Sequence, residues 1–141
     1  MQIRPFQLED ERGVIDLWQQ CNLIRPWNDP CKDIRRKLAV GGKMFLVGEL
    51  NGQIIATVMA GYEGHRGWLN YLAVAPAYRR HGFATRIVAA AETLLQQAGC
   101  PKINLQVRTS NQDVIEFYHR IGYSVDDVVS MGKRLEIDNP K

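Results

Sequence analysis

The spacing of hydrophobic and polar side chains predicts a mixed fold in which helices and strands follow one another along the chain. Apolar residues recur every three or four positions in four segments, which is typical of amphipathic helices. The expected helices are residues 8–21, 31–40, 83–98 and 111–121. Shorter apolar or alternating segments predict strands. The expected strands are residues 2–6, 44–50, 53–62, 68–74, 102–107, 123–129 and 131–135.

Turn signals indicate how these strands pair. Asn51-Gly52 is the strongest two-residue hairpin signal, so the strands on either side of it should form a hairpin. Segment 68–74 should pair next to this hairpin as the third strand of a meander. A right-handed crossover through the following helix then makes segment 102–107 its parallel neighbour. The tail from residue 136 to residue 141 is expected to be frayed.

Composition and charge narrow the class of protein. The chain has 141 residues, of which 45% are hydrophobic, so we expect one domain over residues 1–141 with a sizeable core. No signal peptide begins the sequence and no apolar run approaches about 18 residues, so we expect a cytoplasmic protein with no membrane partner. The formal net charge of +3 is too small for a nucleic-acid-binding face. Three scattered cysteines and no His/Cys cluster argue against a disulfide framework and a metal site.

The most informative stretch joins strand 68–74 to the long helix that begins at Phe83. Pro76 ends the strand, and Arg79-Arg80-His81-Gly82 lies between strand and helix. The first N–H groups of a helix have no partner within it and carry partial positive charge, and Gly82 has no side chain to keep a ligand away. The stretch therefore predicts a phosphate or pyrophosphate site. The alternative is an ordinary strand–turn–helix connection with solvated arginines.

The same stretch resembles a family signature. Arg79-Arg80-His81-Gly82-Phe83-Ala84 is similar to the pattern Arg/Gln-x-x-Gly-x-Gly/Ala of the GCN5-related N-acetyltransferases (the GNAT family). Leu72-x-Val74-x-Pro76 lies just upstream, as in that family, and the likeness covers nearly the whole length. Two loops, 25–30 and 61–67, further resemble the bacterial YpeA-type branch of these acetyltransferases.

This resemblance implies a fold and a cofactor. The implied fold is α/β (α+β), with a mixed, mostly antiparallel sheet of six to seven strands flanked by about four helices. A central V-shaped splay opens between strands 68–74 and 102–107 and takes the pantetheine arm of acetyl-CoA (coenzyme A). The implied cofactor-binding residues are Leu72, Ala73, Val74, Arg79, Arg80, His81, Gly82, Phe83, Ala84, Thr85, Asn111 and Tyr118.

Acetyl transfer to an amine sets the chemistry that the site must supply. The amine must be neutral, the thioester oxygen needs hydrogen-bond donors, and the leaving thiolate is helped by a proton. The resemblance implies that Tyr118 donates this proton, whereas its place beside Phe117 is also typical of a core residue. A backbone N–H at Leu72 or Ala73 is expected to face the oxygen. Asn111 should cap its helix whether or not it also contacts the cofactor.

The general base and the acceptor site are less defined. Many family members carry a glutamate on the central strand, but this strand reads Trp68-Leu69-Asn70-Tyr71. Glu63, or His65 acting through water, is the substitute, and direct capture of the neutral amine is the alternative. Trp27, in a proline-flanked loop, is either a lid over the site or a plug packed on the core. The expected acceptor-binding residues are Arg25, Trp27, Asn28, Asp29, Glu63 and His65.

Three functions compete at this stage. The leading one is an acetyl-CoA-dependent N-acetyltransferase that acts on a primary amine of a small molecule or peptide through a ternary complex. The second is a non-catalytic acyl-CoA-binding regulatory module. The third, nucleic-acid binding through Arg35-Arg36-Lys37 and the Arg79 loop, is disfavoured by the mild charge, and we expect no nucleic-acid partner. An exposed final strand leaves a homodimer open.

Overall fold

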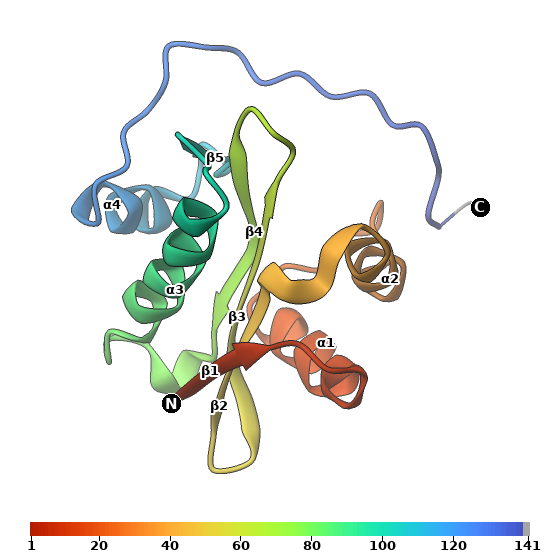
Figure 1. The fold of residues 1–141 in the computed structure, drawn as a ribbon. Coiled ribbons are helices and arrows are strands. Elements are labelled where there is room, and N and C mark those ends of the chain that lie inside the picture. Colours follow the sequence, from red (N-terminus) through yellow and green to blue (C-terminus); the bar gives the residue numbers. More distant parts are fainter. Residues whose placement is uncertain (140–141) are drawn as a thin grey trace.

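The computed structural model describes residues 1–139 and contains a five-stranded sheet with two helices on each face (Figure 1). The strands are β1 (Gln2–Pro5), β2 (Phe45–Leu50), β3 (Gln53–Tyr62), β4 (Gly67–Val74) and β5 (Ile103–Leu105). The α-helices are α1 (Glu11–Gln20), α2 (Pro30–Gly41), α3 (Phe83–Gln97) and α4 (Gln112–Arg120). Short 3-10 helices are η1 (Leu8–Asp10), η2 (Gly42–Met44) and η3 (Pro76–Tyr78).

The sheet follows the order β1-β2-β3-β4-β5, so each strand lies beside the next one in the chain. The first four strands pair antiparallel, and β5 pairs parallel to β4. This pairing confirms the predicted hairpin, meander and parallel crossover. β5 accompanies β4 only from Gly67 to Leu69, whereas β4 continues to Val74. The ladder between the two strands therefore ends at Leu69, at the place where the family resemblance implies a splay.

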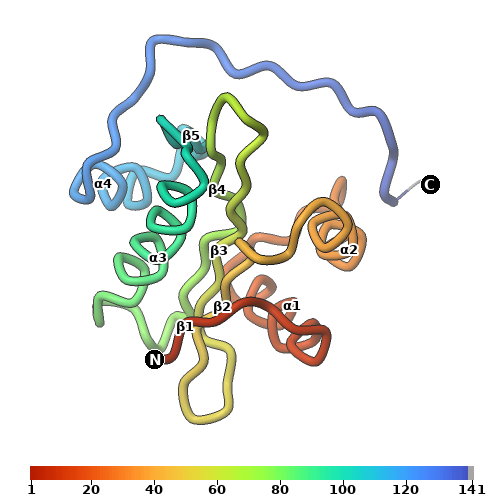
Figure 2. Tube along the Cα trace, in the orientation of Figure 1, coloured from red at the N-terminus to blue at the C-terminus, as the bar shows by residue number. Residues whose placement is uncertain are grey.

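The helices form the outer layers of the molecule. In the trace, α1 and α2 cover one face of the sheet, while α3 and α4 lie on the other (Figure 2). Trp18 and Phe45 are buried under α1 and α2, and Ile87 and Leu95 are buried between α3 and the sheet. Full burial of a side chain of this size stabilises a fold by roughly 1.5–3 kcal/mol relative to exposure. The apolar face predicted for the long helix is thus confirmed at its central positions.

The C-terminal segment differs from the sequence-based prediction. Among the described residues, none of 124–139 is in a strand, so the expectation of strands at 123–129 and 131–135, and of six to seven strands, is wrong. The physical reason is that side chains, not backbone groups, join this segment to β5. β5 itself is shorter than expected because the chain leaves β4 after Leu105.

The predicted fraying from residue 136 is also wrong for residues 136–139. Asp138 is buried, and its carboxylate accepts hydrogen bonds from the Arg36 guanidinium at 2.7 Å and from the Asp29 backbone N–H at 3.0 Å. These donors hold the pKa of Asp138 far below its usual range. Residues 140 and 141 lie outside the described residues. Over residues 1–139, no helix has the length and apolar character needed to cross a membrane.

Candidate active site

The splay exposes a bulged half of β4. Thr57 pairs with Ala73, and Met59 pairs with Asn70. The two-residue advance from Thr57 to Met59 on β3 is therefore matched by a three-residue advance from Asn70 to Ala73 on β4. The extra residue falls near Tyr71, whose φ of +53° lies in the left-handed region. A bulge leaves one residue outside the ladder and re-aims its neighbours. Because β5 does not reach this part of β4, backbone groups that point away from β3 have no strand partner there.

A buried hydrogen-bond chain holds the bulge in place. The indole N–H of Trp18 donates to Thr57 Oγ1 at 2.9 Å, and the Thr57 hydroxyl donates to the carbonyl of Tyr71 at 2.8 Å. The Tyr71 ring stacks on Trp18 with centroids 3.8 Å apart. Its hydroxyl donates to Asp33 Oδ2 at 2.6 Å, and burial together with this carboxylate raises the pKa of Tyr71. Contacts of both the carbonyl and the side chain of Tyr71 therefore hold its backbone in the left-handed conformation.

The loop between β4 and α3 presents free backbone donors. Gly82 is the N-cap residue just before α3, with a φ of +77°, and a Cβ built there would meet nothing within 4 Å. The first turn of α3 has no side-chain cap, so its N–H groups point into open space. Arg80, with a φ of +65°, is exposed beside them. This arrangement suits an anion with several oxygens.

The other residues of this loop mainly shape it. Arg79 turns back, and its Nε donates to the carbonyl of Val74 at 3.2 Å. His81 Nδ1 lies 2.9 Å from the Arg79 carbonyl, and its ring stacks on Phe83. The arginine and histidine therefore secure the turn, and Arg80 is the side-chain cation of the loop that stays exposed without a described partner.

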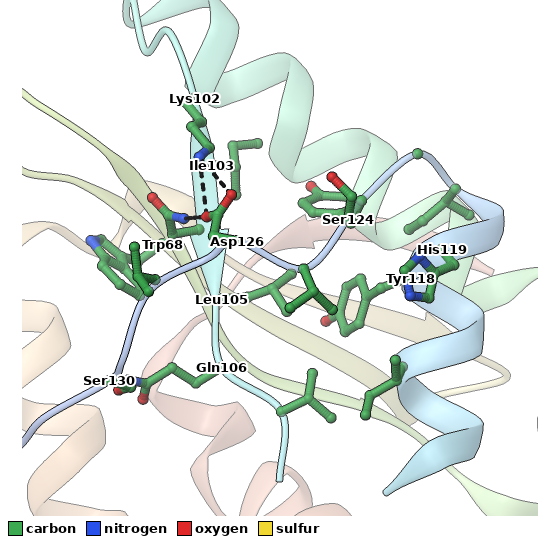
Figure 3. A pocket seen from close by; sticks show the side chains of 18 of the residues that line it. Trp68, Lys102, Ile103, Leu105, Gln106, Tyr118, His119, Ser124, Asp126 and Ser130 are labelled. Carbon is green, nitrogen blue, oxygen red and sulfur yellow. Dashed lines mark hydrogen bonds and ion pairs between the residues drawn. The ribbon is translucent and has the colours of Figure 1, made fainter. Parts of the chain in front are cut away.

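Tyr118 lies on α4 with its hydroxyl toward the end of β5 (Figure 3). The residue is 7% exposed, and Phe117 and Tyr123 contact its ring edge-on. No described residue hydrogen-bonds to its hydroxyl, and the side chain lines a cavity of about 1420 Å³. Burial raises the pKa of Tyr118, so the phenol stays protonated at neutral pH. Tyr118 is thus both a core residue and a free proton donor.

Asn111 occupies the predicted N-cap position of α4 but does not cap the helix through its side chain. The side chain is exposed and hydrogen-bonds to no other described residue. Its amide is consequently available to a ligand.

The loop before α2 reaches across to the chain that follows β5. The guanidinium of Arg108 lies 5.4 Å from the ring centroid of Trp27, which is 48% exposed. Trp27 is therefore not a plug in the core. Asn28 accepts a hydrogen bond from Arg134 at 2.9 Å, and Asp29 caps α2 by accepting from two backbone N–H groups. Arg25, in the same loop, is half-buried.

Glu63 and His65 lie at the opposite end of β4. Their loop connects β3 to Gly67, five residues before Leu72, which corresponds to about 17 Å along a strand. Glu63 Oε1 accepts from the backbone N–H groups of Arg66 and, at 2.8 Å, of His65, and these donors lower its pKa. The structure does not bring these two side chains to Tyr118 or to the bulge.

Several residues of this region were missed by sequence reasoning. Thr57 was detectable in principle, because it is a single polar residue within an apolar strand segment, Ile54 to Ala60. Tyr71, Asp33 and Arg108 gave no such signal. Their importance depends on a bulge and on a loop-to-loop contact, neither of which is encoded by local spacing.

Comparison with known proteins identifies the class. Residues 12–123 match the Acetyltransferase (GNAT) family. An acetyltransferase of Yersinia pestis (strain Pestoides F) is 49% identical over 138 residues, which cover 98% of both chains. The chain therefore belongs to the GNAT family of acetyltransferases, whose members use acetyl-CoA as cosubstrate.

Solved structures show the same fold. Ard1 from Thermoplasma volcanium aligns with a TM-score of 0.77 at 22% identity, covering 89% of this chain and 83% of that one. Chaetomium thermophilum Naa20, in complex with a bisubstrate analogue, aligns with a TM-score of 0.72 at 26% identity, covering 89% of this chain and 72% of that one.

Proposed function

We propose that this chain transfers the acetyl group of acetyl-CoA to a primary amine of a small molecule or peptide, with both substrates bound at once. The proposal is supported by three features of the chain, each described above. They are the bulged half of β4, the loop before α3, and the free hydroxyl of Tyr118. Each meets one need of acetyl transfer.

The loop supports the binding of the cofactor's pyrophosphate. The free N–H groups of the first turn of α3, from Gly82 to Thr85, would donate to its oxygens, and Arg80 would add charge. Arg79, His81 and Phe83 would hold the loop in this shape. Those backbone groups of β4 at Leu72, Ala73 and Val74 that β3 and Arg79 leave unpaired would bond the pantetheine amides. Asn111 would contact the cofactor from the start of α4.

When bound, acetyl-CoA supplies an acetyl group activated as a thioester. The N–H of Leu72 or Ala73 would donate to the thioester oxygen as charge builds there. The amine nitrogen bonds to the acetyl carbon while the carbon–sulfur bond breaks, and Tyr118 gives its proton to the departing sulfur. The nitrogen loses its extra proton to water, and Tyr118 is reprotonated from solvent. Holding both substrates in one site supplies much of the rate.

The loop of residues 25–29 would shape the acceptor site, with Trp27 and Arg108 across its mouth. No carboxylate on β4 is placed to remove a proton from the amine. Gly67, where the loop carrying Glu63 and His65 joins β4, is about 17 Å along the strand from Leu72, so we assign these two side chains no direct contact with the reacting nitrogen. The acceptor would therefore react as its neutral fraction.

A non-catalytic acyl-CoA-binding module is the alternative, since it needs the loop before α3 but not Tyr118. The deciding experiment measures release of free coenzyme A thiol with polyamines, amino acids, aminoglycosides and N-terminal peptides, beside calorimetry of coenzyme A binding. Turnover with any amine supports the enzyme. Tight binding without turnover on any amine favours the module, and no binding contradicts both.

A further inference from the structure

Two arginines, Arg108 and Arg134, approach the loop before α2 from different segments of the chain; we call them the arginine pair. Arg108 follows β5, and its guanidinium carbon lies 5.4 Å from the ring centroid of Trp27. Arg134 belongs to the C-terminal segment, which passes from the side of α4 to the side of α2 (Figure 1). Its Nη2 donates to Asn28 Oδ1 at 2.9 Å. Because Trp27 and Asn28 are consecutive residues, two positive charges from distant parts of the sequence are gathered on one short loop.

The arginine pair has donors to spare. Neither guanidinium is paired with a carboxylate within residues 1–139. Arg108 presents a face to the indole, which leaves the N–H groups at its edge free. Arg134 donates to Asn28 and, at 3.5 Å, to the carbonyl of Glu136, and its other N–H groups remain. Both side chains are exposed, so an anionic oxygen group can reach these donors.

The carboxylates around the same loop already have partners. Asp29 accepts from two backbone N–H groups at the start of α2. Asp138 accepts from the Arg36 guanidinium and from the Asp29 N–H. Asp33 and Glu136 pair with Arg36 at 3.3 and 3.2 Å. These acids therefore offset Arg36, and the charge of the arginine pair is left uncompensated.

The arginine pair lies on the acceptor side of the proposed reaction. Arg108 lines the same cavity as Tyr118, the proposed proton donor. The loop that carries Trp27 is the segment that would shape the acceptor site. β4, from Gly67 to Val74, adds no acidic side chain to this region. An acceptor that reaches Tyr118 past this loop would therefore meet unbalanced positive charge.

We propose that the acceptor amine carries an anionic group, a carboxylate or a phosphate, and that Arg108 and Arg134 bind this group while the amine faces the thioester. The inference rests on the proposed acetyl transfer and names the class of its acceptor. A polyamine or an aminoglycoside has no anion for the arginine pair and brings like charge against it, which is unfavourable. Amino acids, acidic peptides and phosphorylated amines have the required chemistry.

The first test compares acceptors that differ in charge. β-Alanine is paired with β-alaninamide, phosphoethanolamine with ethanolamine, and putrescine serves as the cationic acceptor. Release of coenzyme A thiol is measured over a range of pH, so that kcat/KM is expressed per neutral amine. The anionic member of at least one pair should exceed its uncharged partner by about tenfold, as expected for one charge-assisted hydrogen bond. The two pairs separate a carboxylate from a phosphate. Equal values within both pairs, or putrescine as the best acceptor, overturn the proposal.

The second test assigns the preference to the arginine pair. Arg108→Gln and Arg134→Gln should each bring the ratio of anionic to uncharged acceptor close to one, with an unchanged circular dichroism spectrum because both side chains are exposed. Arg108→Lys keeps the charge and should retain part of the ratio. Arg12→Gln removes an exposed arginine from α1 and is the matched control, for which the ratio should not change. A ratio that survives in both glutamine variants overturns the assignment.

A binding measurement distinguishes failure of this inference from failure of the proposed reaction. Calorimetry follows the binding of β-alanine and of phosphoethanolamine to the protein saturated with coenzyme A. If an anionic amine binds, the two glutamine variants weaken its binding, and no amine is acetylated, the anion site stands while the transfer reaction fails. If amines are acetylated without regard to charge, the reaction stands while this inference fails. If neither anionic amine binds or reacts, the inference is likewise overturned.

Discussion

The hydroxyl of Thr57 donates a hydrogen bond to the backbone carbonyl of Tyr71 across 2.8 Å. The same oxygen accepts the indole N–H of Trp18, so one fully buried side chain joins α1, β3 and the bulge of β4. The bulge sets the direction of the Leu72 and Ala73 N–H groups. Thr57 is thus in a position to control the geometry of the proposed oxyanion donors without touching a substrate.

Replacing Thr57 by valine should lower kcat by about tenfold or more, with a smaller change in KM for acetyl-CoA. Valine keeps the shape of threonine but leaves the Trp18 N–H and the Tyr71 carbonyl unpaired, at about 1–3 kcal/mol each. A loss of 1.4 kcal/mol at the transition state is a tenfold loss of rate. Steady-state kinetics and thermal unfolding of Thr57→Val check this.

Two controls separate geometry from stability. Thr57→Ser keeps the hydroxyl and should retain most of kcat. Ile55→Val, in the same strand, should destabilise by about 1 kcal/mol with kcat unchanged. If Ile55→Val and Thr57→Val lose activity equally, the bulge has no special role in catalysis.

Replacing Tyr118 by phenylalanine should reduce kcat by 10²-fold or more, in keeping with the typical contribution of proton transfer, while coenzyme A affinity is retained. The phenyl ring still fills the space between Phe117 and Tyr123. Kinetics and calorimetry on the same variant measure the two effects. A rate that stays at the level of the unmodified chain at every pH removes Tyr118 from the mechanism.

The pH profile should rise toward the pKa of the acceptor amine and should not fall again below about pH 10. The rise follows because the amine reacts as its neutral fraction. Burial raises the pKa of Tyr118 above that of free tyrosine, about 10, so the proton donor is not lost in this range. Initial rates with two amines of different pKa check this. A midpoint that does not move with the amine contradicts capture of the neutral form.

Replacing Gly82 by alanine should weaken coenzyme A binding by about tenfold, or 1.4 kcal/mol. The added methyl group meets no protein atom, but it enters the space in front of the first turn of α3. The variant should also lose about 1–2 kcal/mol of folding free energy, because alanine is disfavoured at the positive φ of this position. Gly99→Ala is the matched control, because Gly99 follows the other end of the same helix with a φ of +88° and equally open space. Equal binding by both variants, measured by calorimetry, places the pyrophosphate elsewhere.

Replacing Trp27 by alanine should raise KM for the acceptor by a few-fold and leave KM for acetyl-CoA unchanged. The contact of Arg108 with the ring contributes about 0.5–1 kcal/mol at an exposed site. In the proposed function this pair lies across the mouth of the acceptor site. Trp27→Phe keeps a ring face for Arg108, so its KM for the acceptor should stay close to that of the unmodified chain. A rise in KM for acetyl-CoA instead would assign the loop to the cofactor.

Local patterning was sufficient to determine most elements of this protein. The hairpin at Asn51-Gly52, the apolar face of α3 and the glycine before it are all encoded within a few residues, because turn chemistry and helical periodicity are local properties. The candidate loop at residues 79–84 was predictable for the same reason. Tyr118 was implicated through a family resemblance and not through spacing alone.

The tertiary structure alone decided the relations between distant segments. The bulge at Tyr71 depends on Thr57 and Trp18, which are 14 and 53 positions away in the sequence, so no local pattern reports it. Strands were predicted at residues 123–129 and 131–135, yet pairing requires a neighbouring backbone at hydrogen-bonding distance, and within residues 1–139 none is present. The burial of Asp138 likewise depends on Arg36, more than 100 positions earlier, because a charge leaves water only where the fold supplies its partner.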